Sequence, residues 1–137
     1  MCAQERKRLG APPEPIPGRI AVVGVCASGK TTLVEQLQSL GYDARQTGQE
    51  HSQVPDMWQR LSRPQVLIYL DVSLQVARQR GQSYEEPLYH EQHRRLEHAR
   101  KHSHLFIDTT SLTPNQVLER VLAVLQEMGV EPVRSGS

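Results

Sequence analysis

The stretch from Arg19 to Leu40 reads RIAVVGVCASGKTTLVEQLQSL, and it decides the fold. Ile20–Val23 is a short apolar run of the kind that forms a buried strand. From Leu33 onward, apolar side chains recur at helical spacing until Gly41, which predicts a helix with a glycine stop. The eight residues between them, Gly24–Thr31, match G-x-x-x-x-G-K-[ST] at every fixed position. The sequence therefore predicts a strand, a glycine loop and a helix in succession.

A loop of this pattern is suited to binding the phosphates of a nucleotide. Glycines let the backbone approach a ligand closely, and successive N–H groups then form an anion-binding concavity at the start of a helix. Lys30 is placed to reach the β- and γ-phosphates, and the Thr31 hydroxyl to ligate Mg²⁺. A plain strand-to-helix turn is the other interpretation, but such a turn does not require both glycines, the lysine and the threonine. The predicted nucleotide-binding residues are Gly24, Val25, Cys26, Ala27, Ser28, Gly29, Lys30, Thr31 and Thr32.

Length and composition predict one domain with a modest core. The chain has 137 residues, of which 37% are hydrophobic and 4% aromatic, so the core must be largely aliphatic. We expect a domain over residues 19–130, a flexible proline-rich tail over 1–18 and a disordered tail over 131–137. The net charge of +1 favours neither nucleic acid nor a membrane as partner. Two cysteines and no secretory or membrane-spanning segment favour a cytoplasmic setting.

Downstream of the loop, strand patterns alternate with helix patterns. The expected strands cover 20–23, 42–45, 66–70 and 105–107, and the run over 66–70 is apolar throughout, which implies burial on both faces. Further helices are expected over 54–62, 73–80, 87–103 and 113–128, the last opened by a capping box at Thr113. This alternation predicts an α/β fold, a three-layer, doubly wound parallel sheet of about four strands.

Two carboxylates follow expected strands, at the sheet edge where ligands bind in open α/β folds. Glu50 and His51 lie in a polar segment after the second strand, where they are the candidates for acid–base work at the acceptor or for the outer shell of a metal. A solvated loop is the alternative. Asp71 ends the strand over 66–70 and is a candidate Mg²⁺ ligand. Its alternative role is to help Ser73 cap the next helix.

Arginines are concentrated after Asp71, and cationic side chains are a recurring clamp on transferring phosphoryl groups. Arg78, Arg80, Arg94 and Arg95 are the candidates, and a solvated surface helix is the alternative. We assign Lys30, Arg78, Arg80, Arg94 and Glu50 as candidate catalytic residues. The helix over 87–103 also carries histidine pairs at metal-ligand spacing, but no cysteine or H-E-x-x-H motif accompanies them, so we expect no zinc there.

The chain from Ile20 to Val130 resembles the P-loop nucleoside and nucleotide kinases, thymidylate kinase most of all. The resemblance rests on GVCASGKTT, on LIYLDVSLQVARQRG, and on EQHRRLEHARKH followed by LFIDTTSLTPNQVLERVLAVL. It implies a P-loop NTPase fold and a small kinase that transfers the γ-phosphoryl of Mg–ATP, or of GTP, to a small nucleoside-like or nucleotide-like acceptor.

The chain also departs from this family on the acceptor side. These kinases usually carry a strand ending in Asp-Arg between the second strand and the LIYLD-type strand. Only about twenty residues separate Arg45 from Val66, and they contain no Asp-Arg pair. The alternative function is therefore a nucleotide-binding sensor or partner module without phosphoryl transfer. A GTPase switch is disfavoured because the chain has no N-K-x-D motif.

Overall fold

The computed structural model describes residues 13–81 and 84–133. Within them, four strands form one sheet in the order β2-β1-β3-β4, and all neighbouring strands run parallel. The strands are β1 (Ile16–Gly24), β2 (Asp43–Gln46), β3 (Pro64–Asp71) and β4 (Leu105–Asp108). The predicted α/β class, with a parallel sheet of four strands, is confirmed.

Helices connect the strands throughout the described residues. They are α2 (Lys30–Ser39), α3 (Met57–Ser62), α4 (Leu74–Gln79), α5 (Glu86–Arg95), α6 (Glu97–His102) and α7 (Pro114–Glu127), with a 3₁₀ turn η1 (Gln49–His51) after β2. The single helix expected over 87–103 is divided into α5 and α6 at Leu96. This break leaves Leu96 and Ala99 fully buried in a segment that is otherwise polar. None of the described helices is both long enough and apolar enough to cross a bilayer.

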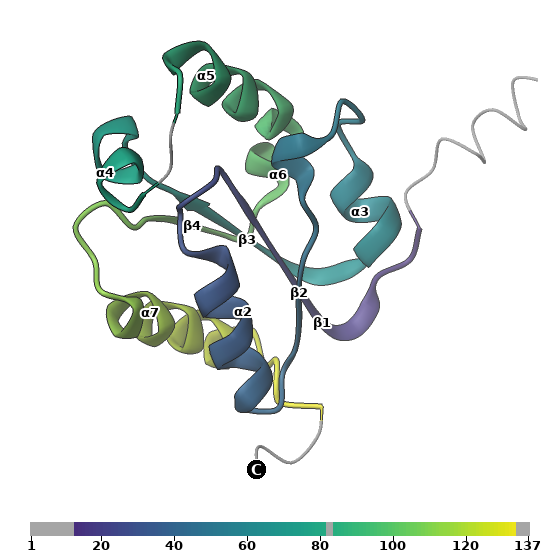
Figure 1. Ribbon diagram of the computed structural model, residues 1–137. Coiled ribbons are helices and arrows are strands. Elements are labelled where there is room, and N and C mark those ends of the chain that lie inside the picture. Colours follow the sequence, from purple (N-terminus) through teal and green to yellow (C-terminus); the bar gives the residue numbers. More distant parts are fainter. Residues whose placement is uncertain (1–12, 82–83, 134–137) are drawn as a thin grey trace, which may run out of the picture.

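Side chains of the central strands alternate between two separate cores, one on each face of the sheet. Ile20 and Val22 of β1 pack with the buried faces of α2 and α7. Ala21 and Val23 point to the opposite face, where Trp58 and side chains from the α4–α6 region pack. Figure 1 shows the same arrangement, with α2 and α7 on one side of the strands and α3, α5 and α6 on the other. The sheet is thus the middle of three layers.

The ordered domain is longer at both ends than the expected range of 19–130. The backbone N–H of Ile16 donates to Arg63 O at 2.8 Å, so β1 begins inside the segment expected to be a flexible tail. At the other end, the N–H of Val133 donates to Gly41 O at 3.1 Å. These backbone bonds tie both segments to the domain. Residues 1–12 and 134–137, which make up the rest of the two expected tails, lie outside the described residues.

The strand order places the loop after β1 at a favourable position for a ligand. The chain leaves β1 through α2 toward β2, whereas the connection from β3 to β4 runs through α4–α6 on the opposite face. Because these two connections lie on opposite faces of the sheet, they leave a crevice between them at the carboxyl ends of the two middle strands. The loop of residues 24–31, called the 24–31 loop below, lies at this crevice.

Candidate functional site

The two glycines of the 24–31 loop are required for different reasons. A Cβ on Gly24 would lie 2.2 Å from Leu70 O, because the backbone of β3 passes directly beside it. Gly29 has a φ of 101°, in the left-handed region, and its Cβ would meet nothing within 4 Å. Ala27 also has a positive φ of 68°, which is unusual for a residue with a side chain and costs about 1–3 kcal/mol. The loop therefore stores backbone strain where the motif predicts a ligand.

Side chains hold the carbonyl groups of this loop. Each carbonyl from Gly24 to Ser28 accepts a side-chain hydrogen bond, and the donors in chain order are Lys30 for the first two, then Tyr84, Arg80 and Thr109. In a trans peptide the N–H points away from the C=O of the same unit. Fixing the carbonyls on one side therefore turns N–H groups of the loop to the other side.

Several of these N–H groups have no partner. Among the residues that the structure describes, no acceptor pairs with the backbone N–H of Ala27, Gly29, Lys30 or Thr31. Gly29 is the N-cap of α2 and supplies no side-chain cap. Free donors at the start of a helix, reinforced by the positive end of its dipole, form an anion-binding site.

Lys30 and Glu50, both predicted as site residues, form a buried ion pair. Their side chains are 7% and 6% exposed, and Lys30 Nζ lies 3.1 Å from Glu50 Oε2. The same ammonium donates to Gly24 O at 2.8 Å and to Val25 O at 2.9 Å, so it is folded back onto its own loop. Glu50 Oε1 is buried and has no hydrogen-bond partner in the described structure.

Glu50 is positioned by its neighbour Gln49, a residue that sequence analysis did not select. The Gln49 side chain is fully buried; its amide donates to Val54 O, and its Oε1 accepts from the N–H of Trp58 at 2.8 Å. Arg95, one of the candidate arginines, also donates to Glu50 O at 3.3 Å. The segment expected to be either a solvated loop or a functional one is therefore a fixed turn whose carboxylate faces the 24–31 loop.

Arg80 is the candidate arginine that contacts the 24–31 loop directly. Its guanidinium donates to Ala27 O at 2.8 Å and to Thr109 O at 2.8 Å. Thr109 in turn donates through Oγ1 to Ser28 O at 2.9 Å. Thr109 was not predicted, although its place directly after β4, at the same sheet edge, was a usable signal.

Gln92 and Tyr84 hold the opposite side of the loop, and neither was predicted. Gln92 is 1% exposed, and its Oε1 accepts from the N–H of Cys26 at 3.1 Å and shares with Cys26 O the single proton of the Tyr84 hydroxyl. Burial raises the pKa of Tyr84, which keeps its hydroxyl protonated and able to donate. A glutamine on a polar helix gives no sequence signal for this role.

Two of the predicted arginines are held elsewhere. Arg78 donates twice to Tyr84 O, at 3.0 and 2.8 Å. Arg94 is 65% exposed and pairs with Glu91 on its own helix, a contact that also lowers the pKa of Glu91. In the described structure neither guanidinium contacts the 24–31 loop. Of the four candidate arginines, Arg80 bonds the loop, and Arg95 bonds the backbone of Glu50.

The two predicted metal ligands, Thr31 and Asp71, have different hydrogen-bond partners, and Asp71 is not part of the cavity lining that contains Thr31. Thr31 Oγ1 accepts from Gln46 Nε2 at 2.9 Å and lines the same cavity as Glu50. Asp71 Oδ1 instead accepts from the N–H of Val72 and lies 2.9 Å from His93 Nε2, a hydrogen bond that raises the pKa of His93. The carboxylate beside Thr31 is therefore that of Glu50, because Asp71 is engaged by α5.

Two cavities flank the loop. One, of about 460 Å³, lies between the loop, Arg80 and the start of α7. The other, of about 340 Å³, is lined by Cys26, Lys30, Thr31, Gln46 and Glu50 together with neighbouring loop residues. Both include Ala27, Gly29 and Thr32, so the loop backbone is the wall that they share.

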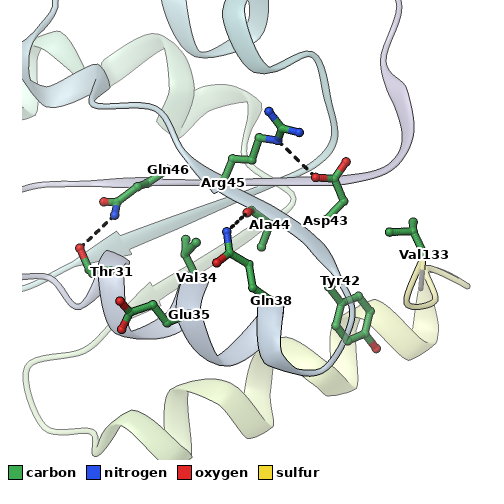
Figure 2. Close-up of a pocket in the computed structure, with 10 residues that line it drawn as sticks. All are labelled: Thr31, Val34, Glu35, Gln38, Tyr42, Asp43, Ala44, Arg45, Gln46 and Val133. Carbon is green, nitrogen blue, oxygen red and sulfur yellow. Dashed lines mark hydrogen bonds and ion pairs between the residues drawn. The ribbon is translucent and has the colours of Figure 1, made fainter. Parts of the chain in front are cut away.

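A larger groove, of about 700 Å³, runs along α2 and the edge strand β2 (Figure 2). Figure 2 shows that its polar side chains are largely paired with groups of the groove itself: Arg45 with Asp43, Gln38 with Ala44 O, and Gln46 with Thr31. A groove whose polar groups are already satisfied offers less to a polar ligand than the loop does, in spite of its size.

No family model matches this chain, and no curated protein matches it. What the site does must therefore be inferred from its own atoms.

Proposed function

We propose that this chain has a P-loop NTPase fold, binds ATP or GTP with Mg²⁺, and transfers the γ-phosphoryl group to a small nucleoside-like or nucleotide-like acceptor. The observation that carries this proposal is the set of unpaired N–H groups in the 24–31 loop, with the Lys30 ammonium beside them. Such a concavity is complementary to a polyphosphate, and the strained loop that makes it has no evident structural purpose.

Lys30 is the group that must move when phosphates bind. In the structure its donors are satisfied by two carbonyls and Glu50. A phosphate in the concavity offers stronger, charge-assisted acceptors, so Lys30 would exchange its carbonyl partners for phosphate oxygens. Glu50 keeps the ammonium close to the loop during that exchange.

The cavity beside Thr31 fits a hard cation. The Thr31 hydroxyl and the unpartnered Oε1 of Glu50 are oxygen ligands of the kind that Mg²⁺ prefers. Mg²⁺, when bound, would neutralise part of the charge on the β- and γ-phosphates. Arg80 would add a further positive charge from the other side of the loop, where its guanidinium is held by Thr109.

The cavity of about 460 Å³ suits the nucleoside part of the ligand. Its size lies within the range of small-molecule sites, and Arg80 on its wall presents a planar guanidinium that can stack on a base. Ser28 Oγ and Gln36 Oε1, from two residues of this lining, are buried without a partner in the described structure. The acceptor would then occupy the cavity on the Glu50 side.

A nucleotide-binding sensor without transfer is the second candidate. Arg78 and Arg94 are committed to other partners, which leaves Arg80 as the guanidinium on the loop among the described arginines. Phosphoryl transfer commonly uses more than one cationic group around the transferring phosphate, whereas binding does not need them.

Calorimetric titration with ATP and GTP, with and without Mg²⁺, tests the binding step. We expect Mg-dependent binding that Lys30→Ala abolishes and that Lys101→Ala, on an exposed lysine of α6, leaves unchanged. Arg80→Ala should weaken binding, whereas Arg94→Ala should not. Incubation with labelled ATP and pooled nucleosides and nucleotides then tests transfer. Binding without transfer to any acceptor would favour the sensor, and absence of binding would overturn both candidates.

A further inference from the structure

A second cluster of chemically capable side chains lies at the entrance to the Glu50 cavity. Cys26 Sγ lies 3.8 Å from His51 Nε2, and that nitrogen lies 3.6 Å from Glu50 Oε2. One ligand atom from each of the three residues falls within 4.8 Å of the others. Two elements far apart in sequence supply them: the 24–31 loop supplies Cys26, and η1 supplies the adjacent pair Glu50 and His51.

The buried carboxylate indicates that a ligand belongs in this cluster. The Glu50 side chain is only 6% exposed, and its Oε1 has no hydrogen-bond partner in the described structure. An unsatisfied buried acceptor is costly unless a missing partner supplies the interaction. Because Lys30 contacts Oε2, the second oxygen remains available to a cation.

The separations suit a tetrahedral metal ion. With typical bond lengths of about 2.3 Å to sulfur and about 2.0 Å to nitrogen or oxygen, tetrahedral angles place sulfur about 3.5 Å from nitrogen and nitrogen about 3.3 Å from oxygen. The observed 3.8 Å between Cys26 Sγ and His51 Nε2 exceeds the first value by only a few tenths of an ångström. His51 Nε2 lies 3.6 Å from Glu50 Oε2, on the same carboxylate group as the unpartnered Oε1. The His51 side chain is 63% exposed, so it is free to make that adjustment without disturbing the core.

We propose that Cys26, Glu50 and His51 form a three-ligand site for a thiophilic divalent cation of the Zn²⁺ type, with the fourth position open to water. A thiolate and an imidazole select Zn²⁺ over Mg²⁺, which prefers oxygen ligands alone. On binding, Cys26 loses its thiol proton to solvent, and the thiolate adds a negative charge beside the carboxylate that Glu50 shares with Lys30. This site forms without nucleotide, but it uses the same Glu50 carboxylate that we propose for Mg²⁺, so the two cations would compete for it.

Cobalt titration of the full chain without nucleotide tests the site. The protein carries Cys2→Ser so that Cys26 is its single thiol. Co²⁺ should bind one-to-one with a thiolate-to-cobalt charge-transfer absorption, and Zn²⁺ should displace it while Mg²⁺ does not. Cys26→Ser should remove the absorption, and His51→Ala should weaken affinity by about tenfold or more. His90→Ala, at an exposed histidine of α5, is the matched control and should bind as before.

Glu50→Gln is a second variant for the cobalt titration. Because this substitution also removes the counter-charge of the buried Lys30, the folding of the variant is checked by circular dichroism. His51→Ala changes an exposed side chain and keeps the test informative if Glu50→Gln does not fold. Absence of a thiolate band, or equal cobalt affinity in His51→Ala and in the parent protein, would overturn the proposal. The nucleotide titrations above are separate measurements, so either inference can fail alone.

Discussion

The buried pair of Lys30 and Glu50 permits a quantitative test by a double-mutant cycle. Both side chains are more than nine-tenths buried, and 3.1 Å separates their charged atoms. Lys30→Met keeps much of the side-chain volume but leaves a carboxylate buried without a counter-charge. Breaking a buried pair from one side typically costs about 3–5 kcal/mol. We expect Lys30→Met to lose unfolding free energy in this range.

The rest of the cycle separates the pair from its surroundings. Glu50→Gln should cost less than Lys30→Met, because the ammonium keeps Gly24 O and Val25 O as acceptors. The double variant carries no buried charge at this position and should recover a large part of the loss. The resulting interaction free energy should be about 2–3 kcal/mol, near the top of the range for residues in direct contact.

Urea denaturation followed by circular dichroism gives the four free energies. Inorganic phosphate is left out of these measurements, because an anion bound to the folded state would add its own stabilisation. If Lys30→Met lost less than about 1 kcal/mol, or if the two single losses simply added, the two charges would not be coupled in the folded protein. The interpretation that Lys30 is held in a stabilising ion pair with Glu50 would then be wrong.

Two further predictions concern backbone strain and pH. Gly24→Ala should lower the unfolding free energy by about 1–3 kcal/mol or more, and by more than Gly29→Ala does. A Cβ at position 24 would lie 2.2 Å from the backbone oxygen of Leu70, whereas a Cβ at position 29 would meet nothing within 4 Å. Equal losses of the two variants in urea denaturation would contradict this prediction. Burial lowers the pKa of His98, which accepts from Trp58 Nε1. The His98 contribution to stability should therefore fall as pH drops below about 6.5, opposite in sign to the contribution of His93, whose pKa is raised. The His98→Gln variant should lose the His98 contribution in thermal melts monitored by Trp58 fluorescence; a pH dependence equal to that of the parent protein would contradict it.

The parts of the site that sequence reasoning predicted are those marked by local sequence pattern or by their place after a strand. The 24–31 loop and the start of α2 are contiguous, and their glycines and Lys30 have roles set by local backbone geometry. In the structure Gly24 and Gly29 occupy backbone positions that a Cβ would disfavour, as expected for these two glycines. Glu50 was predicted from its place after a strand, and the sheet order brings it to the loop.

The missed residues act across long sequence separations and through backbone atoms. Gln92 reaches the N–H of Cys26 over 66 positions, and Thr109 reaches Ser28 O over 81. A side chain that bonds a carbonyl or an N–H needs no matching residue type at its partner, so the sequence does not mark the pair, although the place of Thr109 after β4 was a usable signal for that residue alone. Arg78 and Arg94 were selected for their charge alone, and in this structure their guanidinium groups are bonded to oxygens away from the 24–31 loop.

The loop is held by hydrogen bonds within the protein itself, and this decides where the cost of binding falls. Its carbonyls are bonded by side chains from four separate elements or loops, so turning an N–H away from the concavity would break at least one of those bonds. Ligand binding then requires little backbone rearrangement, and the main cost is to release Lys30 from its carbonyl partners. Tyr84→Phe should therefore weaken anion binding without contacting the anion, because it frees the Cys26 carbonyl to rotate. Equal phosphate affinity in Tyr84→Phe and the parent protein would show that the strand and helix alone hold the loop.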